Sequence, residues 1–421
     1  MARHPKPAEG SWTEHYPGLG TGPVSYADSI SPAFFELERE AIFKRTWLQV
    51  GRVEQLPRHG SYFTREIAVA HTSVIVVRDA EDRVRAFHNI CRHRGNKLVW
   101  SDFPGRETSG TARQFTCKYH GWRYGLDGAC TFVQQEGEFF NLDKADYGLV
   151  EVSCDIWAGF IFINFESRPR QALRDFLGPM VTAIEDFPFD RLTQRYGFRS
   201  SVSANWKLMT DALQEQYHAP IVHANQRSES FEEHNFAGGF EAPHYQIDGP
   251  HRMFNSAGIR PWELPEDQIK PSEQLLRGGL FGPWDPPEFY ESTQVKGMRP
   301  GGHERVGVAL FEIWPNFAIQ LWERGWYHTY QHWPTSYDRH IFEWNMYFAP
   351  PRTAAEAVAQ EMTAVSLKEF ALQDDSLIES IQLTLGSAGL TDFPLGDQEI
   401  LCRHLHKTAQ DWVADFQEPG S

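Results

Sequence analysis

Short apolar runs separated by turn signals dominate the chain between residues 48 and 165. Ser73–Arg78 reads SVIVVR and predicts a strand, the acidic segment 79–82 predicts a turn, and Arg83–Asn89 predicts a second strand. Trp157–Phe165 is almost wholly apolar and predicts a buried strand that closes the region. This pattern predicts a compact all-β module over residues 48–165.

The segment before this module, residues 1–47, carries one helical signal. Residues 1–26 are rich in Pro, Gly and His without periodicity, which predicts an arm. Ser31 is a favourable N-cap and Pro32 is favoured at the first helical position. We therefore predict a helix that runs from there to near Trp47.

Helical and strand patterns mix from residue 166 to residue 421. A stretch at 228–304 is rich in Gly, Pro and aromatic residues with little periodicity, which is typical of a functional cover. The remainder predicts an α+β domain. Its predicted elements are helices over Gln171–Phe187, Asn205–Asn225 with a break at Pro220, Thr353–Leu385 and Gly396–Phe416, and four alternating strands of one antiparallel sheet within Gly307–Pro350.

Composition narrows the possible functions. Of 421 residues, 41% are hydrophobic and 23% charged, as in ordinary globular proteins. A formal net charge of −16 repels phosphate backbones, which argues against nucleic acid as a partner. No apolar leader opens the chain, and the longest apolar run, Ile156–Phe165, is too short to cross a bilayer. Five cysteines do not look like a disulfide framework, so we expect a reducing, cytoplasmic compartment.

Two segments of the β module each bring one cysteine close to one histidine. The chain contains Cys91-x-His93 and Cys117-x-x-His120. A zinc finger would pair two cysteines in one segment and two histidines in the other, whereas each segment here mixes the two types. A [2Fe–2S] centre with two Cys on one iron and two His on the other needs this composition. Cys130, Cys154 and Cys402 have no such partners and are read as small buried residues.

A second constellation follows in the segment NWKLMTDALQEQYHAPIVHAN, residues 205–225. His218 and His223 are five positions apart, too far around an ideal helix to share a metal. A break at Pro220 would bring both to one centre. Two His with one carboxylate form the facial triad of non-haem Fe(II) oxygenases. The alternative is a polar helix face beside two core histidines.

The two constellations, in this order, resemble the alpha (catalytic oxygenase) subunit of Rieske non-haem iron ring-hydroxylating oxygenases. C-x-H-R-G at Cys91 and C-x-x-H-G-W at Cys117 resemble the family's Rieske domain, although a Gly/Ser/Thr-rich insertion at 102–111 lengthens the interval between them. The string D-x₃-E-x-Y-H-x₄-H, which begins at Asp211, resembles the family's catalytic motif. The resemblance implies that Cys91 and Cys117 hold the inner iron and His93 and His120 the outer one.

The resemblance also implies a third ligand for the mononuclear Fe(II), an Asp on a C-terminal helix. In the family this Asp lies five residues before a Glu and eight before a Gln. Asp374 has both, Glu379 and Gln382, and Asp375 is the alternative. Glu215 would bridge His218 to the cluster ligand His120 of a neighbouring subunit, with Asp211 as the rival for this role.

The implied fold is α+β, with the all-β Rieske [2Fe–2S] domain (48–165) inserted in a helix-grip (START-like) catalytic domain formed by residues 1–47 and 166–421. The implied function is a terminal oxygenase that takes electrons from a separate ferredoxin or NAD(P)H-dependent reductase and uses O₂ for mono- or dioxygenation. Assembly would be a homotrimer, or an α3β3 complex with a small beta subunit.

The aromatic content of 14% suits a wide apolar pocket, and the expected pocket residues are mostly apolar, so we expect an apolar aromatic or polycyclic substrate rather than a small charged amine. The expected pocket residues are Leu208, Met209, Leu213 and Phe311, together with parts of the stretch 228–304. Three alternatives remain open: an oxidative demethylase of the same family, a Rieske electron-transfer protein with a non-catalytic ligand-binding domain, and a ligand-binding module with structural zinc.

Overall fold

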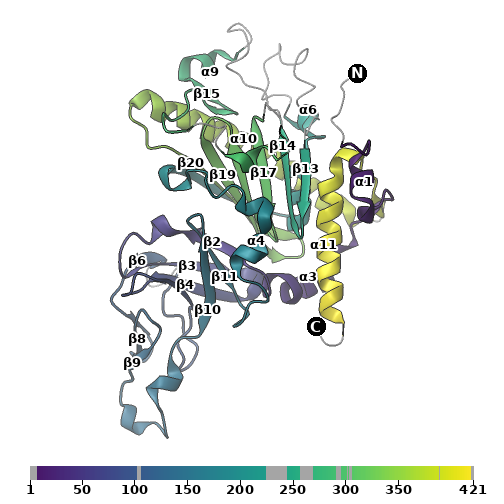
Figure 1. The fold of residues 1–421 in the computed structure, drawn as a ribbon. Coiled ribbons are helices and arrows are strands. Elements are labelled where there is room, and N and C mark those ends of the chain that lie inside the picture. Colours follow the sequence, from purple (N-terminus) through teal and green to yellow (C-terminus); the bar gives the residue numbers. More distant parts are fainter. Residues whose placement is uncertain are drawn as a thin grey trace. The chain divides into compact units, whose positions relative to one another are not determined.

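The computed structural model describes residues 7–101, 106–223, 244–256, 269–290, 295–300, 302, 306–387 and 389–418. The chain divides into two compact units (Figure 1). One comprises Arg39–Phe176, and the other combines Met1–Glu38 with Leu177–Ser421. The first unit is thus inserted into the second, from residue 39 rather than 48 and up to residue 176 rather than 165. Within the described ranges, no helix is both long and apolar enough to span a membrane.

Strands are the main regular elements of the inserted unit, which confirms the predicted β module. Its larger sheet has the order β2-β11-β10-β5-β4-β3-β6, and β7, β8 and β9 form a smaller one. Trp157 belongs to the strand before the turn at Ala158-Gly159, so the closing strand is shorter than predicted. The strands are β2 Leu48–Arg52, β3 Ser61–Ile67, β4 Thr72–Arg78, β5 Val84–His88, β6 Ser109–Thr111, β7 Phe115–Thr116, β8 Arg123–Tyr124, β9 Cys130–Phe132, β10 Glu151–Trp157 and β11 Phe160–Asn164.

A seven-stranded sheet forms the centre of the second unit, with the order β12-β20-β19-β18-β17-β14-β13. All its pairs are antiparallel. The four strands predicted within 307–350 are confirmed as β17 to β20, whereas the other three were not predicted. The strands are β12 Gln194–Val202, β13 His244–Asp248, β14 His251–Ser256, β17 Val308–Ile313, β18 Phe317–Trp322, β19 Trp326–Ser336 and β20 Arg339–Phe348.

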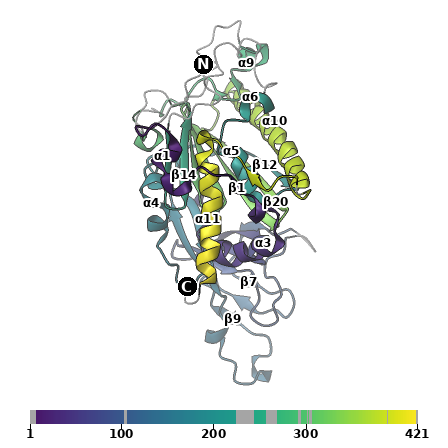
Figure 2. The ribbon, with the colours of Figure 1, turned by 90° about the vertical axis from the view of Figure 1, so that its right-hand side faces the viewer.

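Three main helices accompany this sheet: α5 Trp206–Leu213, α10 Ala354–Leu385 and α11 Ile400–Gln417. The Thr353 side chain caps α10 by accepting a hydrogen bond from Glu356 N, so the predicted start is confirmed. Both α10 and α11 pack against α5 (Figure 2). The smaller elements are α1 Trp12–His15, α2 Ala27–Ile30, α3 Pro32–Glu38, α4 Leu173–Thr182, α6 Ala219–Val222, α9 Pro271–Leu276, β1 Val24–Ser25, β15 Gly278–Gly279, β16 Gly282–Pro283 and β21 Asp392–Phe393.

One face of this sheet and the inner face of α10 share a hydrophobic core. The core joins Ala318, Tyr330 and Trp344 of the sheet to Leu367 and Ala371 of the helix. Because side chains alternate along a strand, every second residue of β17 to β20 contributes to this face. The space between sheet and helix is therefore lined by a defined set of positions.

Candidate metal centres

The cysteine and histidine pairs of the inserted unit lie on two loops. Cys91 and His93 follow β5, while Cys117 and His120 lie between β7 and β8. Both cysteines are buried, at 2% and 3% exposure, and both histidines are half-buried. The two histidine rings lie 4.6 Å apart, and their Nδ1 atoms are separated by 3.1 Å. The histidines therefore present one ring nitrogen each to a shared point near the surface.

Neighbouring groups hold these side chains in place. The Trp122 ring stacks on His93 at 5.0 Å and 6°. The Asn96 side chain donates to Cys117 Sγ at 3.7 Å, and Tyr124 Oη lies 3.2 Å from Cys91 Sγ. Burial lowers the pKa of His93, with the charges of His120 and Arg94 adding to the effect, which favours the neutral imidazole that binds a metal. The two buried thiols and the two half-buried imidazoles fit the donor set of a Rieske cluster.

Replacing His93 or Cys117 with alanine is expected to abolish the visible and EPR spectra of the cluster. The physical reason is that a set of two Cys and two His contains no spare ligand. Mononuclear iron, measured by metal analysis, should remain. Cys130→Ala is the matched control and should retain the cluster spectrum. A His93→Ala protein with the full EPR signal of the reduced cluster would contradict the ligand assignment.

The second constellation lies at a corner between α5 and α6. α5 ends at Leu213, and α6 begins at Ala219 with Pro220 in its first turn, where the missing N–H is harmless. The prediction that Pro220 itself breaks the helix is therefore wrong, because the chain leaves helical geometry earlier. Glu215 and His218 consequently do not share a helix face, but they are neighbours within this corner.

Three potential metal ligands converge at this corner. His218 Nε2 and His223 Nε2 lie 3.6 and 3.3 Å from Asp374 Oδ1, which α10 contributes. One ligand atom from each residue lies within 4.8 Å of the others. His223 Nε2 and Asp374 Oδ2 are buried and have no hydrogen-bond partner. A bound metal ion would satisfy both atoms. The donor set fits a mononuclear non-haem iron.

Both histidines are oriented by a hydrogen bond on the far side of the ring. His218 Nδ1 lies 2.5 Å from Glu215 Oε1, and His223 Nδ1 lies 2.7 Å from Gln373 Oε1. Burial lowers the pKa of His218, but the hydrogen bond and charge of Glu215 and the charge of Asp374 outweigh it, so the pKa is raised. These contacts place the proton on Nδ1 and aim each Nε2 at the metal position.

The structure separates the two candidate aspartates. Asp374 is 1% exposed and faces the histidines, whereas Asp375 accepts a hydrogen bond from Ser200 Oγ of β12 at 3.0 Å. Burial raises the pKa of Asp375 to about 6. The geometry therefore favours Asp374 as the third ligand and gives Asp375 a contact with the sheet.

Two side chains that follow Asp374 fix α10 against the segment before α5. Glu379 Oε1 accepts from Ser203 N at 2.7 Å, and Gln382 Oε1 accepts from Asn205 N at 2.8 Å. The spacing of five and eight residues after Asp374 therefore places Glu379 and Gln382 where they can accept these hydrogen bonds. These bonds set the position of Asp374 along α10 relative to the chain that carries the histidines.

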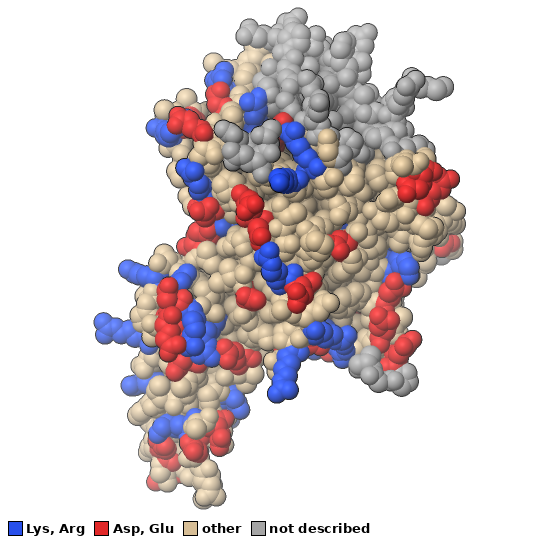
Figure 3. Space-filling view, viewed as in Figure 1, with Lys and Arg blue, Asp and Glu red and all other residues tan. Residues whose placement is uncertain are grey.

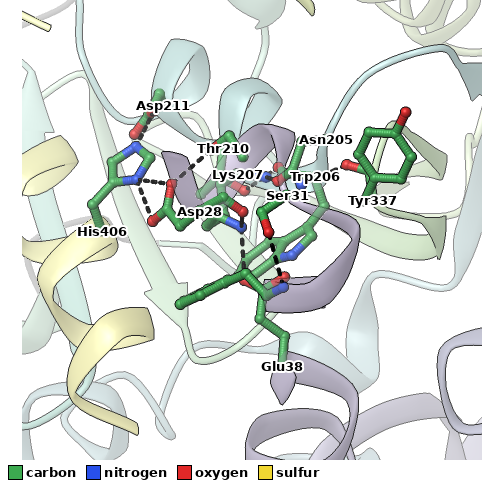
Figure 4. A network of polar contacts seen from close by, with 12 residues as sticks. Asp28, Ser31, Glu38, Asn205, Trp206, Lys207, Thr210, Asp211, Tyr337 and His406 are labelled. Atoms are coloured by element: carbon green, nitrogen blue, oxygen red, sulfur yellow. Dashed lines mark hydrogen bonds and ion pairs between the residues drawn. The ribbon is translucent and has the colours of Figure 1, made fainter. Parts of the chain in front are cut away.

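Asp211, which belongs to α5, takes part in a different set of contacts (Figure 4). His406 of α11 is fully buried, and its Nδ1 and Nε2 each lie 2.9 Å from a carboxylate oxygen, of Asp28 and Asp211 respectively. Lys207, also fully buried, donates to Glu38 Oε1 at 2.7 Å and to the Asp28 carbonyl at 3.1 Å. Because carboxylates accept on both sides, His406 carries both protons.

The ion pairs of this network offset the large free-energy cost of burying its charged side chains. Burial lowers the pKa of His406, but Asp211 and Asp28 outweigh it and raise the pKa to about 10. Burial raises the pKa of Asp28, but His406 and Lys207 lower it to about 2. The sequence offered no signal for His406, because its partners lie 195 and 378 residues away.

Replacing His406 with alanine is expected to lower the free energy of unfolding by about 3 to 5 kcal/mol at pH 7, since two carboxylates lose their buried cation. The contribution of His406 is fully present below its unfolded pKa, near 6.5, and is lost as pH rises through about 10. Urea titrations at pH 7 and 10 measure this. Lys407→Ala, which breaks the exposed pair with Asp411, is the control and should change little. Equal losses for both variants would contradict the role of the network.

The four expected pocket residues do not lie together. Leu208 lines a groove of about 200 Å³ beside Asp211, Glu215, His218 and Asp374. Met209 is fully buried in the core, and Leu213 packs against the core. Phe311 lies on the other face of the sheet, because alternation along β17 directs Leu310 and Glu312 toward α10. Of the stretch 228–304, which was expected to contribute, residues 228–243, 257–268, 291–294, 301 and 303–304 lie outside the described residues.

On the face drawn in Figure 3, acidic and basic side chains are interspersed rather than gathered by sign. This distribution fits the acidic overall composition and differs from the basic stripe of a nucleic-acid-binding surface.

Two solved structures share the fold of nearly the whole chain. A quaternary ammonium Rieske monooxygenase in complex with an inhibitor superposes with a TM-score of 0.71 at 19% identity, covering 97% of this chain and 99% of that one. Naphthalene 1,2-dioxygenase from Rhodococcus sp. bound to indole gives a TM-score of 0.67 at 20% identity, covering 94% and 95%. These similarities concern the fold.

Similarity in sequence points to the same family. The glycine betaine monooxygenase oxygenase subunit of Pseudomonas aeruginosa is 35% identical over 192 residues, 45% of this chain and 42% of that protein. The chain thus matches less than half the length of such a curated relative. Residues 46–144 match the Rieske [2Fe-2S] domain, and residues 189–415 match the ring-hydroxylating alpha subunit (catalytic domain). With both domains matched and both ligand sets in place, the chain belongs to the family of Rieske-type ring-hydroxylating alpha subunits.

Proposed function

We propose that the chain is a terminal oxygenase component that oxidises an organic substrate with O₂. Electrons would enter the two-Cys, two-His cluster singly from a separate ferredoxin or NAD(P)H-dependent reductase. The observation that carries the proposal is the convergence of His218, His223 and Asp374, with each histidine oriented by its own hydrogen bond. Five free cysteines fit a reducing compartment such as the cytoplasm.

The residues of the chain perform the positioning steps of this reaction. Glu215 and Gln373 hold the Nδ1 protons of the two histidines and keep each Nε2 directed inward. Asp374 adds one negative charge from the helix side. When bound, the mononuclear iron would supply O₂ activation, and a facial set of three ligands leaves positions for O₂ beside the substrate.

Two substrate classes have support. An apolar aromatic or polycyclic compound suits the aromatic core between sheet and α10, and the fold is shared with naphthalene 1,2-dioxygenase. A quaternary ammonium compound is favoured by the names of a glycine betaine monooxygenase and a quaternary ammonium monooxygenase among the similar proteins. Oxidative demethylation of such a compound would begin with the same hydroxylation chemistry.

The test is product formation from isotopically labelled oxygen. The enzyme, loaded with both metals, is supplied with a reductase, NAD(P)H and ¹⁸O₂, and panels of aromatic and quaternary ammonium compounds are assayed by mass spectrometry. One or two ¹⁸O atoms in product identify mono- or dioxygenation. A protein whose cluster is reduced and reoxidised without any oxygenated product from either panel would instead be an electron-transfer protein. A colourless protein containing only zinc would contradict both readings.

We further propose that Glu215 receives the cluster of a second copy of the chain. The groove beside Glu215 and His218 has an apolar rim that includes Leu377 and Ile381, which are 44% and 38% exposed. A head-to-tail ring of three would place the His120 end of one chain in the groove of the next. A homotrimer and an α3β3 complex with a small beta subunit both satisfy this arrangement.

Co-assembly of two inactive variants tests the proposed ring of three chains. A His120→Ala chain and a His218→Ala chain are each expected to be inactive, and their joint assembly should restore part of the product formation. Restoration requires an intact cluster in one chain to serve intact iron in another. Mixed trimers, verified by differently tagged chains, that remain as inactive as both parents would overturn transfer between chains while leaving the oxygenase assignment intact.

A further inference from the structure

Arg252 of β14 is fully buried, which is unusual for an arginine. Because side chains alternate along a strand, Arg252 lies on the same face of the sheet as Phe254, which packs in the core with Leu208 of α5. Burial lowers the pKa of Arg252, and the charge of Glu312, directly opposite on β17, acts against this effect. The guanidinium, which stays protonated in proteins, is thus directed from the sheet toward α5.

The Arg252 side chain is hydrogen-bonded to the end of α5. Its Nε donates to Gln214 Oε1 at 2.8 Å, and its Nη1 donates to the Pro250 carbonyl at 3.3 Å. Gln214, the C-cap residue of α5, is itself fully buried, and its Nε2 donates to Asp211 Oδ1 at 3.2 Å. A guanidinium only donates and a carboxylate only accepts, so these partners fix the orientation of the Gln214 amide. Gln214 therefore joins the end of α5 to the central sheet.

The residue that follows Gln214 belongs to the iron site. Glu215 turns its carboxylate back on the corner between α5 and α6. Its Oε1 lies 2.5 Å from His218 Nδ1, and its Oε2 accepts from the backbone N–H groups of Tyr217 and His218. Gln214 is buried in the core, whereas Glu215 lines the groove. Adjacent Cα atoms are only about 3.8 Å apart, so the position of the Gln214 backbone sets the position of Glu215.

We propose that Arg252 is a positioning residue that acts through Gln214 to fix the corner that carries Glu215 and His218, an inference that rests on the proposed oxygenase function. The corner lies between two helices rather than within one, so side-chain contacts must hold it in place. Asp374, the ligand on α10, is set by hydrogen bonds to the chain before α5. The bond from Arg252 would be a separate anchor for the side of the site that carries the histidines.

Gln214→Met tests the proposal. It removes both side-chain hydrogen bonds and keeps a side chain of similar length, while Arg252 retains its charge opposite Glu312. Fe(II) is titrated anaerobically into cluster-containing protein whose mononuclear site has been emptied by chelation. The affinity for Fe(II) should fall about 10-fold, the lower end of the range for groups that orient metal ligands, with the cluster spectrum unchanged. Gln360→Met is the matched control, a buried glutamine of α10 that donates to the Ala349 carbonyl at 2.9 Å, and it should leave the affinity unchanged.

Arg252→Lys tests the other end of the same hydrogen bond. A single ammonium cannot contact Gln214 and the Pro250 carbonyl together as the planar guanidinium does, so Fe(II) affinity should fall as in Gln214→Met. The double variant should bind Fe(II) no more weakly than either single variant, because both remove one interaction. Hydrogen exchange of the amides of residues 214–222, measured without iron, should be faster in Gln214→Met and unchanged in Gln360→Met.

Wild-type affinity for Fe(II) in Gln214→Met would overturn the proposal, and so would losses that multiply in the double variant. Where Gln214→Met does not fold, the same titration of Arg252→Lys decides, and an unchanged affinity there would overturn the proposal. Iron binding is measured without turnover. An active oxygenase whose variants bind iron normally defeats only this inference, whereas the expected losses in a protein that forms no oxygenated product defeat only the proposed function.

Discussion

An Asp374→Ala enzyme is expected to lose its mononuclear iron and all oxygenated product while retaining the full cluster spectrum. Asp374 is the only carboxylate among the three converging donors, and its Oδ1 lies within 3.6 Å of both histidine Nε2 atoms. Two neutral imidazoles alone hold Fe(II) weakly, because the facial set needs its anionic member. His218→Ala and His223→Ala should give the same result. Metal analysis, EPR and product assay measure the three properties separately.

Asp375→Ala is the matched control for this prediction. Asp375 is adjacent in sequence and carries the same charge, but it contacts Ser200 of the sheet. Its loss should therefore leave iron and most of the activity in place. An inactive, iron-free Asp375→Ala together with an active Asp374→Ala would show that the neighbour is the ligand.

Glu215→Ala should keep both metals and lower product formation at least about 100-fold. Glu215 holds His218 Nδ1 and also lines the open groove, so its carboxylate can contact a donor outside its own chain. Removing a group that only orients a metal ligand typically costs 10- to 100-fold. We expect the larger loss because the proposed bridge between chains would be broken as well. The direct measurement is the rate at which a pre-reduced cluster is reoxidised in a single turnover.

Gln373→Ala separates the two roles of Glu215. Gln373 performs the same orienting task for His223, but it does not line the groove. Its loss should lower activity by about 10-fold or less and leave cluster reoxidation fast relative to Glu215→Ala. Equal effects of the two substitutions on the single-turnover rate would reduce Glu215 to an orienting residue.

The sequence predicted elements whose pattern is local. The helix over 353–385 has a capping Thr353 and no interior Gly or Pro, and the strands within 307–350 are bounded by turns, so both were predicted correctly. β12 alternates half-buried and exposed positions but was not recognised. The sequence predicted a helix break at Pro220, although a proline in the first turn of a helix is compatible with that helix.

The site was predictable where chemistry is carried by neighbours in sequence. Both Cys–His pairs and the two triad histidines are short motifs, whereas the contacts of His406 with Asp28 and Asp211 join residues 378 and 195 positions apart. The sequence pattern also does not predict on which side of the sheet Phe311 lies. All six residues of β17, the polar Glu312 included, are buried, so no exposed position distinguishes the face turned toward α10 from the other face.

The bond between His406 and Asp211 has a consequence for how the protein is made. Ribosomes add about 5 to 20 residues per second, so the 195 residues that separate these partners take about 10 to 40 seconds to synthesise. Throughout this interval the nascent chain already contains His218 and His223 but has not yet received the cation that fixes Asp211. We expect iron insertion to follow release from the ribosome, so that stalled chains which end before α11 would carry the complete set of cluster ligands but bind mononuclear iron poorly.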